Sequence, residues 1–315
     1  MDRVELAEIL RPSYQKRVQS FNTQEGRFVY YTSAKAGLQI LKERAIWMRA
    51  AACMNDYREI RYGIDLFNHM FYGSPERKAH LLQIVEAFGW HGKLLEELLL
   101  KINSDENTLV RRIFLTCISE NEAGEESACG RLSMWRGYGR KTGMAFVLRA
   151  PALLRPGNQL PLTVSPVEYL SQEKFERLLD DILVKVEMHM EELRQMNREL
   201  LLKYFLDTVL FSVFSIKHPG FQEEREWRVI YREDSGGLEH EIVSIDGIPQ
   251  MIYKIPLRLS HEAGPGLDMD ALFDHLIIGP TEYADVIADA FVCILEELGF
   301  AHARDRVLKS NIPLR

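Results

Sequence analysis

The sequence predicts an α+β fold, in which a central mixed or antiparallel sheet carries two helical insertions. Strand-like segments do not alternate regularly with helical ones, which argues against a doubly wound parallel sheet. The insertions are expected at about 57–105 and 171–216, and the second is rich in Glu, Leu, Lys and Met. No internal repeat, low-complexity stretch or linker interrupts the chain, so residues 1–315 are expected to form a single domain.

Short apolar runs bounded by turn residues predict the strands, and helical spacing of apolar residues predicts the helices. The strands are expected at 28–31, 46–48, 113–118, 144–148, 162–169, 226–232, 239–245, 250–258 and 275–278. The helices are expected at 1–20, 34–44, 57–72, 75–102, 128–137 and 281–298, with two more in 171–216. Ser33 is available as an N-cap, and Ser74-Pro75 supplies a cap followed by a proline at the first helical position. The nearly all-apolar run 205–214 is expected to be buried.

Composition restricts the classes of protein to which the chain can belong. Hydrophobic residues make up 46% and aromatic residues 10%, enough for an ordered core, and the net charge of −7 argues against general affinity for nucleic acid or anionic membranes. The apolar runs are too short to span a bilayer, and the first residues are acidic where a signal peptide is basic. The four cysteines are scattered without a CxxC motif, which disfavours disulfides and structural zinc. A cytoplasmic protein without membrane contact is expected.

The segment Glu224-Arg225-Glu226-Trp227-Arg228 leads into a predicted strand. Residues two apart on a strand share a face, so Glu224, Glu226 and Arg228 are expected to point the same way. Such a face suits a polar cleft, because like charges raise the pKa of one carboxyl and a neighbouring Arg lowers that of the other. The strand could then supply a catalytic acid or base, or a carboxylate that stabilises a cationic intermediate. The alternative is an edge strand whose charges prevent aggregation.

A local basic island extends from 131 to 167, where no acidic residue occurs. Its basic residues are Arg131, Arg136, Arg140, Lys141, Arg149 and Arg155. Arg matches phosphate oxygens in bidentate fashion, and the island's glycines would let backbone N–H groups approach a ligand. The island therefore suggests a nucleotide-type small molecule or a nucleic-acid backbone. The alternative is a solvated hairpin with ordinary turn glycines.

The known phosphate loops are missing from this region. Gly137, Gly139 and Gly143 miss the GxGxxG spacing by one residue, and Lys141 lacks the preceding glycine of a Walker loop. Aromatic residues that could stack on a base or on nicotinamide are Tyr30, Tyr31, Trp47, Trp135, Tyr138 and Trp227, although aromatic residues in strands are more often core. No group of His, Asp and Glu has metal-ligand spacing, so no metal is expected.

Read in order, these pieces resemble a widespread bacterial family of unknown function, from about residue 28 to the C-terminus. The motifs that carry the resemblance are Tyr30-Tyr31-Thr32-Ser33, Asn55-Asp56, Ser133-Met134-Trp135-Arg136-Gly137-Tyr138-Gly139, Glu224-Arg225-Glu226-Trp227-Arg228, Ile277-Ile278-Gly279-Pro280 and Ser310-Asn311-Ile312-Pro313-Leu314-Arg315. The family supplies no activity that can be transferred.

More distantly, the order of motifs is similar to that of ADP-ribosyltransferases, which cleave NAD or transfer ADP-ribose from it. The resemblance implies a catalytic role for Glu226, with Glu224 positioning the acceptor, and NAD as cofactor. It implies NAD contacts by Tyr30, Tyr31, Thr32, Asn55, Ser119, Trp135, Arg136, Tyr138, Arg140 and Arg228. This chain has Tyr30 where the family is expected to have His, which puts cofactor binding in question at that position. A role as a bacterial toxin or defence effector is implied by the resemblance alone, and it leaves open whether the acceptor is a protein or a nucleic acid.

Three functions therefore compete. The first is an enzyme that cleaves NAD or transfers ADP-ribose from it. The second is a non-enzymatic sensor that binds a nucleotide or a nucleic-acid end through the basic island. The third is a phosphodiester-processing enzyme that uses Glu224 and Glu226 with a divalent metal.

Overall fold

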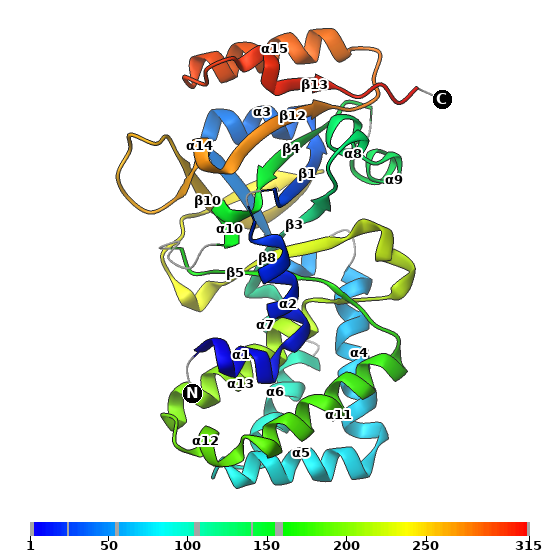
Figure 1. Ribbon diagram of the computed structural model, residues 1–315, viewed down its shortest axis with the longest axis vertical. Helices are drawn as coiled ribbons and strands as arrows, with labels where there is room; N and C mark the ends of the chain where they lie inside the picture. The colour runs from blue at the N-terminus through cyan, green and yellow to red at the C-terminus, as the bar shows by residue number, and fades with distance from the viewer. Residues whose placement is uncertain are drawn as a thin grey trace. The chain divides into compact units, whose positions relative to one another are not determined.

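A computed structural model describes residues 3–23, 25–53, 57–103, 108–139, 141–154 and 160–313. Its contacts divide the chain into two compact units, each assembled from separate stretches of sequence (Figure 1). Unit 1 comprises 1–18, 50–113 and 165–223, and unit 2 comprises 19–49, 114–164 and 224–315. Both predicted helical insertions, 57–105 and 171–216, fall within unit 1. The single-domain organisation stays a prediction, because contact density alone does not define a cooperative folding unit.

Unit 1 is mainly helical. Its helices are α1 (Arg3–Leu10), most of α2 (Pro12–Phe21), α4 (Tyr57–Gly73), α5 (Pro75–Ala87), α6 (Lys93–Asn103), α7 (Thr108–Arg111), α11 (Gln172–Met188), α12 (Met190–Arg194) and α13 (Arg198–Val213). The 3-10 turns η1 (Ala51–Cys53) and η3 (Pro219–Glu224) and the paired strands β6 (Glu168–Tyr169) and β7 (Ile216–Lys217) accompany them. Ser74 caps α5 as expected, accepting from the Arg77 amide at 3.3 Å. The predicted helix 75–102 is divided in two, because Gly89 adopts a φ of 72°.

Unit 2 is built on the sheet. Its strands are β1 (Arg27–Ser33), β2 (Ala45–Ala50), β3 (Ile113–Asn121), β4 (Gly143–Arg149), β5 (Leu162–Pro166), β8 (Glu226–Arg232), β9 (His240–Ile245), β10 (Ile248–Arg258), β11 (Leu267–Asp268), β12 (Phe273–Ile278) and β13 (Val307–Lys309). The helical segments are α3 (Ala34–Glu43), α8 (Glu125–Cys129), α9 (Leu132–Met134), a π-helical turn η2 (Trp135–Gly139), α10 (Ala150–Leu154), η4 (Glu233–Ser235), α14 (Met269–Leu272), α15 (Ala284–Glu297) and η5 (Ala303–Arg306).

The sheet is mixed, which confirms that part of the predicted fold class. The main path runs β11-β10-β2-β3-β1-β4-β12-β13, while β8 pairs with both β3 and β5, and β9 pairs with β10. β4 is antiparallel to β1 and β12, whereas β13 runs parallel to β12. Because β8 has neighbours on both sides, it is not an edge strand. The alternative interpretation of the segment 224–228, as part of a charged edge strand, is therefore wrong.

The two faces of the sheet are named here after two adjacent residues of β1. The Tyr31 face carries Val29 and Tyr31, together with Ala145, Val147 and Ile277 from the neighbouring strands. The Tyr30 face carries Phe28 and Tyr30, with Met144, Phe146 and Leu148 opposite on β4.

Different segments cover these two faces within unit 2. The helix α3 packs on β4 over the Tyr30 face, where Gly37 lies directly against Met144, and α15 contacts α3 (Figure 1). Met134 and Trp135 cover the Tyr31 face. The predicted helix 128–137 is interrupted here, because Gly130 has a φ of 71° and ends α8.

Candidate functional site

β8 places Glu226 and Arg228 on the Tyr31 face of the sheet. The indole Nε1 of Trp227 donates to Glu120 Oε1 at 2.7 Å, and its ring centroid lies 5.0 Å from that of Phe28, so Trp227 belongs to the Tyr30 face. Alternation along the strand then directs Glu226 and Arg228 to the opposite face. The predicted sharing of a face by these two residues is therefore observed.

Glu224 does not continue this strand. It ends the 3-10 turn η3, and Arg225 follows with a φ of 44°, in the left-handed region. The Arg225 carbonyl still accepts from the Glu120 amide at 2.9 Å, and its guanidinium contacts Glu122 and Glu126. The strand begins at Glu226, so the predicted alignment of Glu224 with Glu226 on one strand face is absent.

Glu226 and Arg228 form a buried ion pair. Arg228 Nε donates to Glu226 Oε1 at 2.7 Å, and its Nη2 lies 3.5 Å from Oε2. The two side chains are only 6% and 3% exposed. Taking both charges out of water costs free energy that their attraction only partly offsets, so such a pair is weak evidence for stability alone. The Arg228 guanidinium fixes the position of the Glu226 carboxylate. If stability alone were required, two apolar side chains at these buried positions would serve as well or better.

Arg131 connects the three predicted motifs of unit 2. Its backbone N–H donates to the Tyr31 hydroxyl at 2.9 Å, and its guanidinium donates to the carbonyls of Glu120 and Glu224 at 3.2 Å each. Its Nε lies 3.3 Å from a carboxylate oxygen of Glu126. Burial raises the pKa of Tyr31, and its contacts with Arg131 oppose this. The sequence analysis included Arg131 in the basic island but not among the site residues. The feature of the sequence that could have drawn attention to Arg131 is its position directly after Gly130.

Tyr30 and Thr32 lie on the Tyr30 face, opposite to the face that carries Tyr31 and Ser119. Burial raises the pKa of Tyr30, and hydrogen bonds with the side chains of Thr116 and Thr32 act in the other direction. Tyr30 also lines a small apolar pocket with Phe146 and Phe273. Ser119 pairs with Val29 and is buried on the Tyr31 face. The adjacent residues Tyr30 and Tyr31 therefore lie on opposite faces of the sheet and contact different groups.

Trp135 is a core residue of unit 2. Its ring meets Tyr31 edge-on at 4.8 Å between centroids, and its Nε1 donates to the Cys129 carbonyl at 2.9 Å. A methyl group placed on Gly130 or Gly279 would approach this ring to 2.6 or 2.8 Å. Both glycines are therefore needed for the ring to fit, and the ring does not stand free as a stacking surface. Tyr138 packs half-buried against the same cluster.

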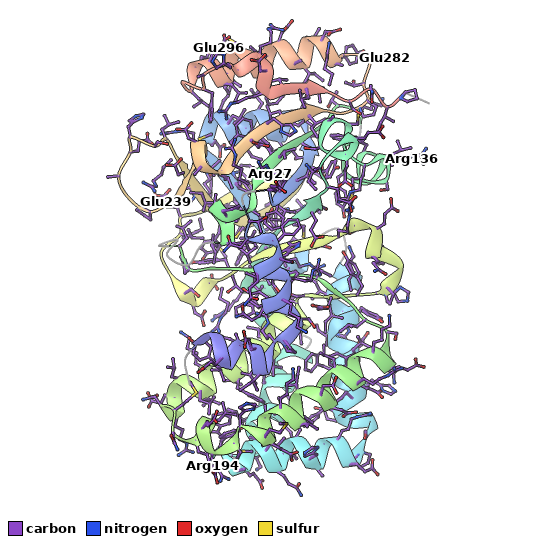
Figure 2. All side chains as sticks on the ribbon, in the orientation of Figure 1. Arg27, Arg136, Arg194, Glu239, Glu282 and Glu296 are labelled. Carbon is purple, nitrogen blue, oxygen red and sulfur yellow. The ribbon has the colours of Figure 1, made fainter. Side chains whose placement is uncertain are left out.

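The basic island does not act as one group. Arg149 bonds Asp274, whereas Arg136 and Lys141 are exposed, and Figure 2 shows Arg136 projecting from the surface. The predicted contacts Asn55 and Arg140 lie outside the described residues. Of the island, Arg136 and Lys141 are the described cations that remain open to a ligand.

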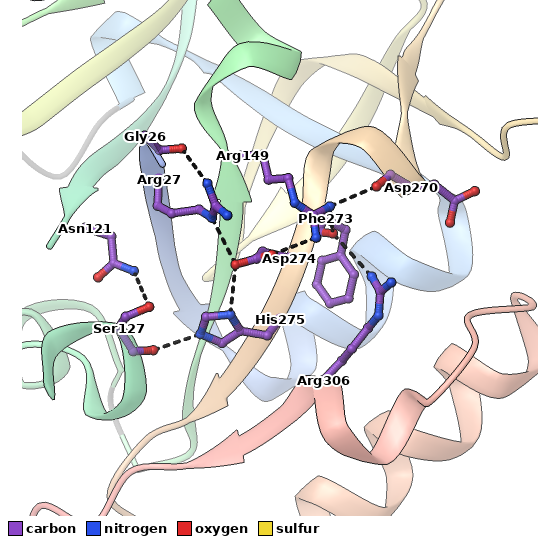
Figure 3. Close-up of polar contacts among 10 residues, drawn as sticks. All are labelled: Gly26, Arg27, Asn121, Ser127, Arg149, Asp270, Phe273, Asp274, His275 and Arg306. Carbon is purple, nitrogen blue, oxygen red and sulfur yellow. Dashed lines mark hydrogen bonds and ion pairs between the residues drawn. The ribbon is translucent and has the colours of Figure 1, made fainter. Parts of the chain in front are cut away.

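A second polar cluster, which the sequence did not indicate, lies where β1, β4 and β12 meet (Figure 3). Asp274 accepts from Arg27 Nε at 3.0 Å and from Arg149 Nη2 at 2.7 Å, and it lies 3.3 Å from His275 Nδ1. The hydrogen bond with His275 and the two guanidiniums hold the pKa of Asp274 well below its usual range, although burial opposes them. His275 Nε2 also bonds the Ser127 carbonyl at 2.8 Å. The cluster ties the start of β12 to its neighbours.

Two further kinds of site are absent from the described part of the chain. No set of three or more His, Cys, Asp or Glu side chains there is grouped closely enough to hold a metal ion. No helix in the described ranges is both long and apolar enough to cross a bilayer.

Part of the chain matches a known protein family. Residues 134–229 match the model of a family described as Protein of unknown function (DUF2971), which confirms the resemblance to a family of unknown function over that stretch. The match contains Trp135, Tyr138, Glu226 and Arg228, but neither Tyr31 nor Ser119. No curated protein and no solved structure matched the chain.

Proposed function

We propose that unit 2 is an ADP-ribosyltransferase-like domain that cleaves the bond between nicotinamide and ribose in NAD, with Glu226, on the Tyr31 face, as its catalytic carboxylate. One observation carries the proposal: Tyr31, Ser119 and Glu226 come from three separate strands, yet share this face. Arg131 supports the arrangement, because it bonds both Tyr31 and the Glu224 carbonyl. These are the positions to which the resemblance assigns the three NAD-binding motifs.

In this proposal Glu226 stabilises the cationic ribose. When the bond between C1′ and the nicotinamide nitrogen breaks, its electron pair leaves with nicotinamide and the ribose acquires oxocarbenium character. A fixed carboxylate stabilises that charge, as in glycosidic cleavage. Water or an acceptor hydroxyl then bonds to C1′ and releases a proton. Arg228 orients the carboxylate of Glu226, and the exposed Arg136 and Lys141 are available to the pyrophosphate.

A non-enzymatic nucleotide sensor is the second candidate function. It is favoured by the burial of Glu226 and by the engagement of its carboxylate with Arg228. A carboxylate held in this way can keep a binding face in shape without taking part in a reaction. The metal-dependent alternative draws no comparable support from the described side chains.

Nicotinamide release by the purified full chain tests the proposal. We expect wild type to release nicotinamide from NAD, and Glu226→Gln to lower the rate at least about 100-fold, in the range seen when one stabilising group is removed. Gln keeps the size of the side chain and a hydrogen bond to Arg228, and thermal unfolding checks that the variant is folded. Glu282→Gln, at an exposed glutamate of unit 2 (Figure 2), is the matched control and should retain the wild-type rate.

Two results would decide against NAD cleavage. Absence of nicotinamide with wild type, with or without protein or nucleic-acid acceptors, contradicts the proposal. If calorimetry then shows that nucleotide binds without turnover, the sensor function is supported. Equal rates for Glu226→Gln and wild type would remove Glu226 from the reaction.

A further inference from the structure

Unit 1 contains an apolar cavity of about 110 Å³, separate from the site described above. It lies among α4, α5, α11 and α13, beside the turn between α1 and α2. Its aromatic lining residues are Tyr14, Phe67, Phe71, Phe175 and Phe205. An apolar cavity of roughly 150 Å³ is large enough to bind benzene. The cavity in unit 1 is somewhat smaller than this but of the same order, so a ligand in it is limited to one small ring.

Two of the polar residues that line this cavity are neighbours. Glu168 on β6 and Ser215, just before β7, both line it, and the Glu168 amide donates to the Ser215 carbonyl at 2.7 Å. Glu168 Oε1 and Ser215 Oγ are both buried, and neither has a hydrogen-bond partner among the described residues. Ser215 as a whole is only 3% exposed. Glu168 on β6 and Ser215, which precedes β7, thus each bring an unpartnered oxygen to the lining of the same cavity.

Unpartnered oxygens of this kind are costly. A buried polar group without a hydrogen bond destabilises a fold by about 1–3 kcal/mol, and most such groups in folded proteins are satisfied. The carboxylate oxygen of Glu168 needs a donor, and the Ser215 hydroxyl can accept as well as donate. The cavity therefore matches a molecule with an apolar body and a donating group at one end.

Charge near Glu168 selects the type of donor. Burial raises the pKa of Glu168, whereas the positive charges of Arg17 and Arg11 act to lower it. Arg11 itself bonds Ser165 Oγ at 2.7 Å and lies over the Tyr14 ring at 4.1 Å. With two guanidiniums already present, an added ammonium would be repelled. A carboxylate ligand could not donate to Glu168, so the donor should be neutral, and a hydroxyl can donate to Glu168 while it accepts from Ser215 Oγ.

We propose that unit 1 binds a small hydroxyl-bearing aromatic compound of the phenol class in this cavity. The ring occupies the apolar space, and the hydroxyl bonds Glu168 Oε1 and Ser215 Oγ. Neither the sequence motifs nor the matched family assigns a ligand to this part of the chain.

The test compares phenol with fluorobenzene, which has nearly the same shape but no donor. Calorimetric titration of the full chain should show phenol binding at least about 5-fold more tightly, the ratio expected from one or two hydrogen bonds. Ser215→Ala should weaken phenol binding roughly 3–10-fold and leave fluorobenzene binding unchanged. Val209→Phe, which fills the cavity from α13, should abolish binding of both compounds.

Fluorine NMR with 4-fluorophenol provides a readout that does not depend on heat of binding, and thermal unfolding shows whether each variant is folded. Equal affinity for phenol and fluorobenzene would overturn the proposal, because a bound water would then be satisfying the two oxygens. Absence of binding by both compounds would also overturn it. A selective loss of phenol affinity in Ser215→Ala would support it.

Discussion

At the scale of single residues, unit 2 holds its charges in place by satisfying them locally. Glu226 is fixed by Arg228, and Arg131 is held by two backbone carbonyls and Glu126. Asp274 lies between Arg27 and Arg149. Charged hydrogen bonds of this kind are stronger than neutral ones, so removing one partner from any of these groups is expected to destabilise the fold, even where the intact pair contributes little net stability.

Asp274 gives a prediction about pH. Replacing it by Asn should lower the free energy of unfolding by about 2 kcal/mol at pH 7, the typical contribution of hydrogen bonds to a charged group. The pKa of Asp274 in the folded protein lies below the ordinary value of 3.8. The carboxylate therefore stabilises the fold fully at pH values above 3.8. This stabilisation is lost as the pH falls through the folded pKa. Urea unfolding at several pH values should therefore show the difference between wild type and variant shrinking below about pH 4.

Asp289→Asn is the matched control. Asp289 pairs with Arg304 at 3.0 Å, but both side chains are largely exposed, at 66% and 73%. Exposed pairs contribute about 0–1 kcal/mol, so this change should have little effect at any pH. An effect of Asp274→Asn that is equally small, or that does not depend on pH, would contradict the role given to the cluster.

The residues of the candidate site were only partly predictable from the sequence. Alternation along a strand correctly placed Glu226 with Arg228, because that relation is local. Alternation also predicts that Tyr30 and Tyr31 lie on opposite faces. It does not predict which of the two contacts Trp135, because that depends on the segment that covers each face. The polar cluster at Asp274 joins strands distant in the chain, and no local pattern marks it.

At the scale of elements, the π-helical turn η2 depends on close packing around Trp135. Gly279→Ala should lower the free energy of unfolding by roughly 1–3 kcal/mol, because the added methyl would lie 2.8 Å from the ring. Gly137→Ala in η2 is the control, since its methyl would meet nothing within 4 Å. It should be neutral or slightly stabilising, as the loss of chain entropy on folding is smaller for Ala. Chemical unfolding measures both variants.

A second substitution tests the cause of the Gly279 effect. Trp135→Phe removes the ring atoms that the new methyl would approach, so it should cost less in the Gly279→Ala background than in wild type. Strictly additive losses would mean that the glycine is required for another reason.

Element boundaries followed from the sequence where the signal was local. The strand 226–232 coincides with β8, and Ser33 caps α3 by accepting from the Ala36 amide at 3.2 Å. The strand β13 was missed, because it is short and is defined by its pairing with β12. The run 205–214 was expected to be buried, yet much of it is only half-buried. Phe205 and Val209 from this run face the cavity of unit 1, which apolar character alone could not reveal.

At the scale of the whole molecule, the matched stretch 134–229 is not expected to fold on its own. It contains β4 but neither of the partners of that strand, β1 and β12, and it contains only residues 226–229 of β8, without β3. It also has Trp135 without Tyr31 or Gly279. A fragment of these residues should therefore lack a cooperative thermal transition and show the narrow amide dispersion of an unfolded chain by NMR. The full chain is the control, and a cooperative transition in the fragment would contradict this account.

The interleaved path of the chain sets an order of events during synthesis on the ribosome. All of unit 1 has been made by residue 223, whereas unit 2 begins at residue 19 and continues to the end of the chain. The central strand β4 must therefore wait for β12, about 130 residues later, or on the order of ten seconds at ordinary rates of translation. During that interval one edge of β4 has no strand beside it. The helical unit 1, most of whose sequence lies between segments of unit 2, can therefore be the first to fold, and the incomplete sheet of unit 2 is the part most exposed to aggregation during synthesis.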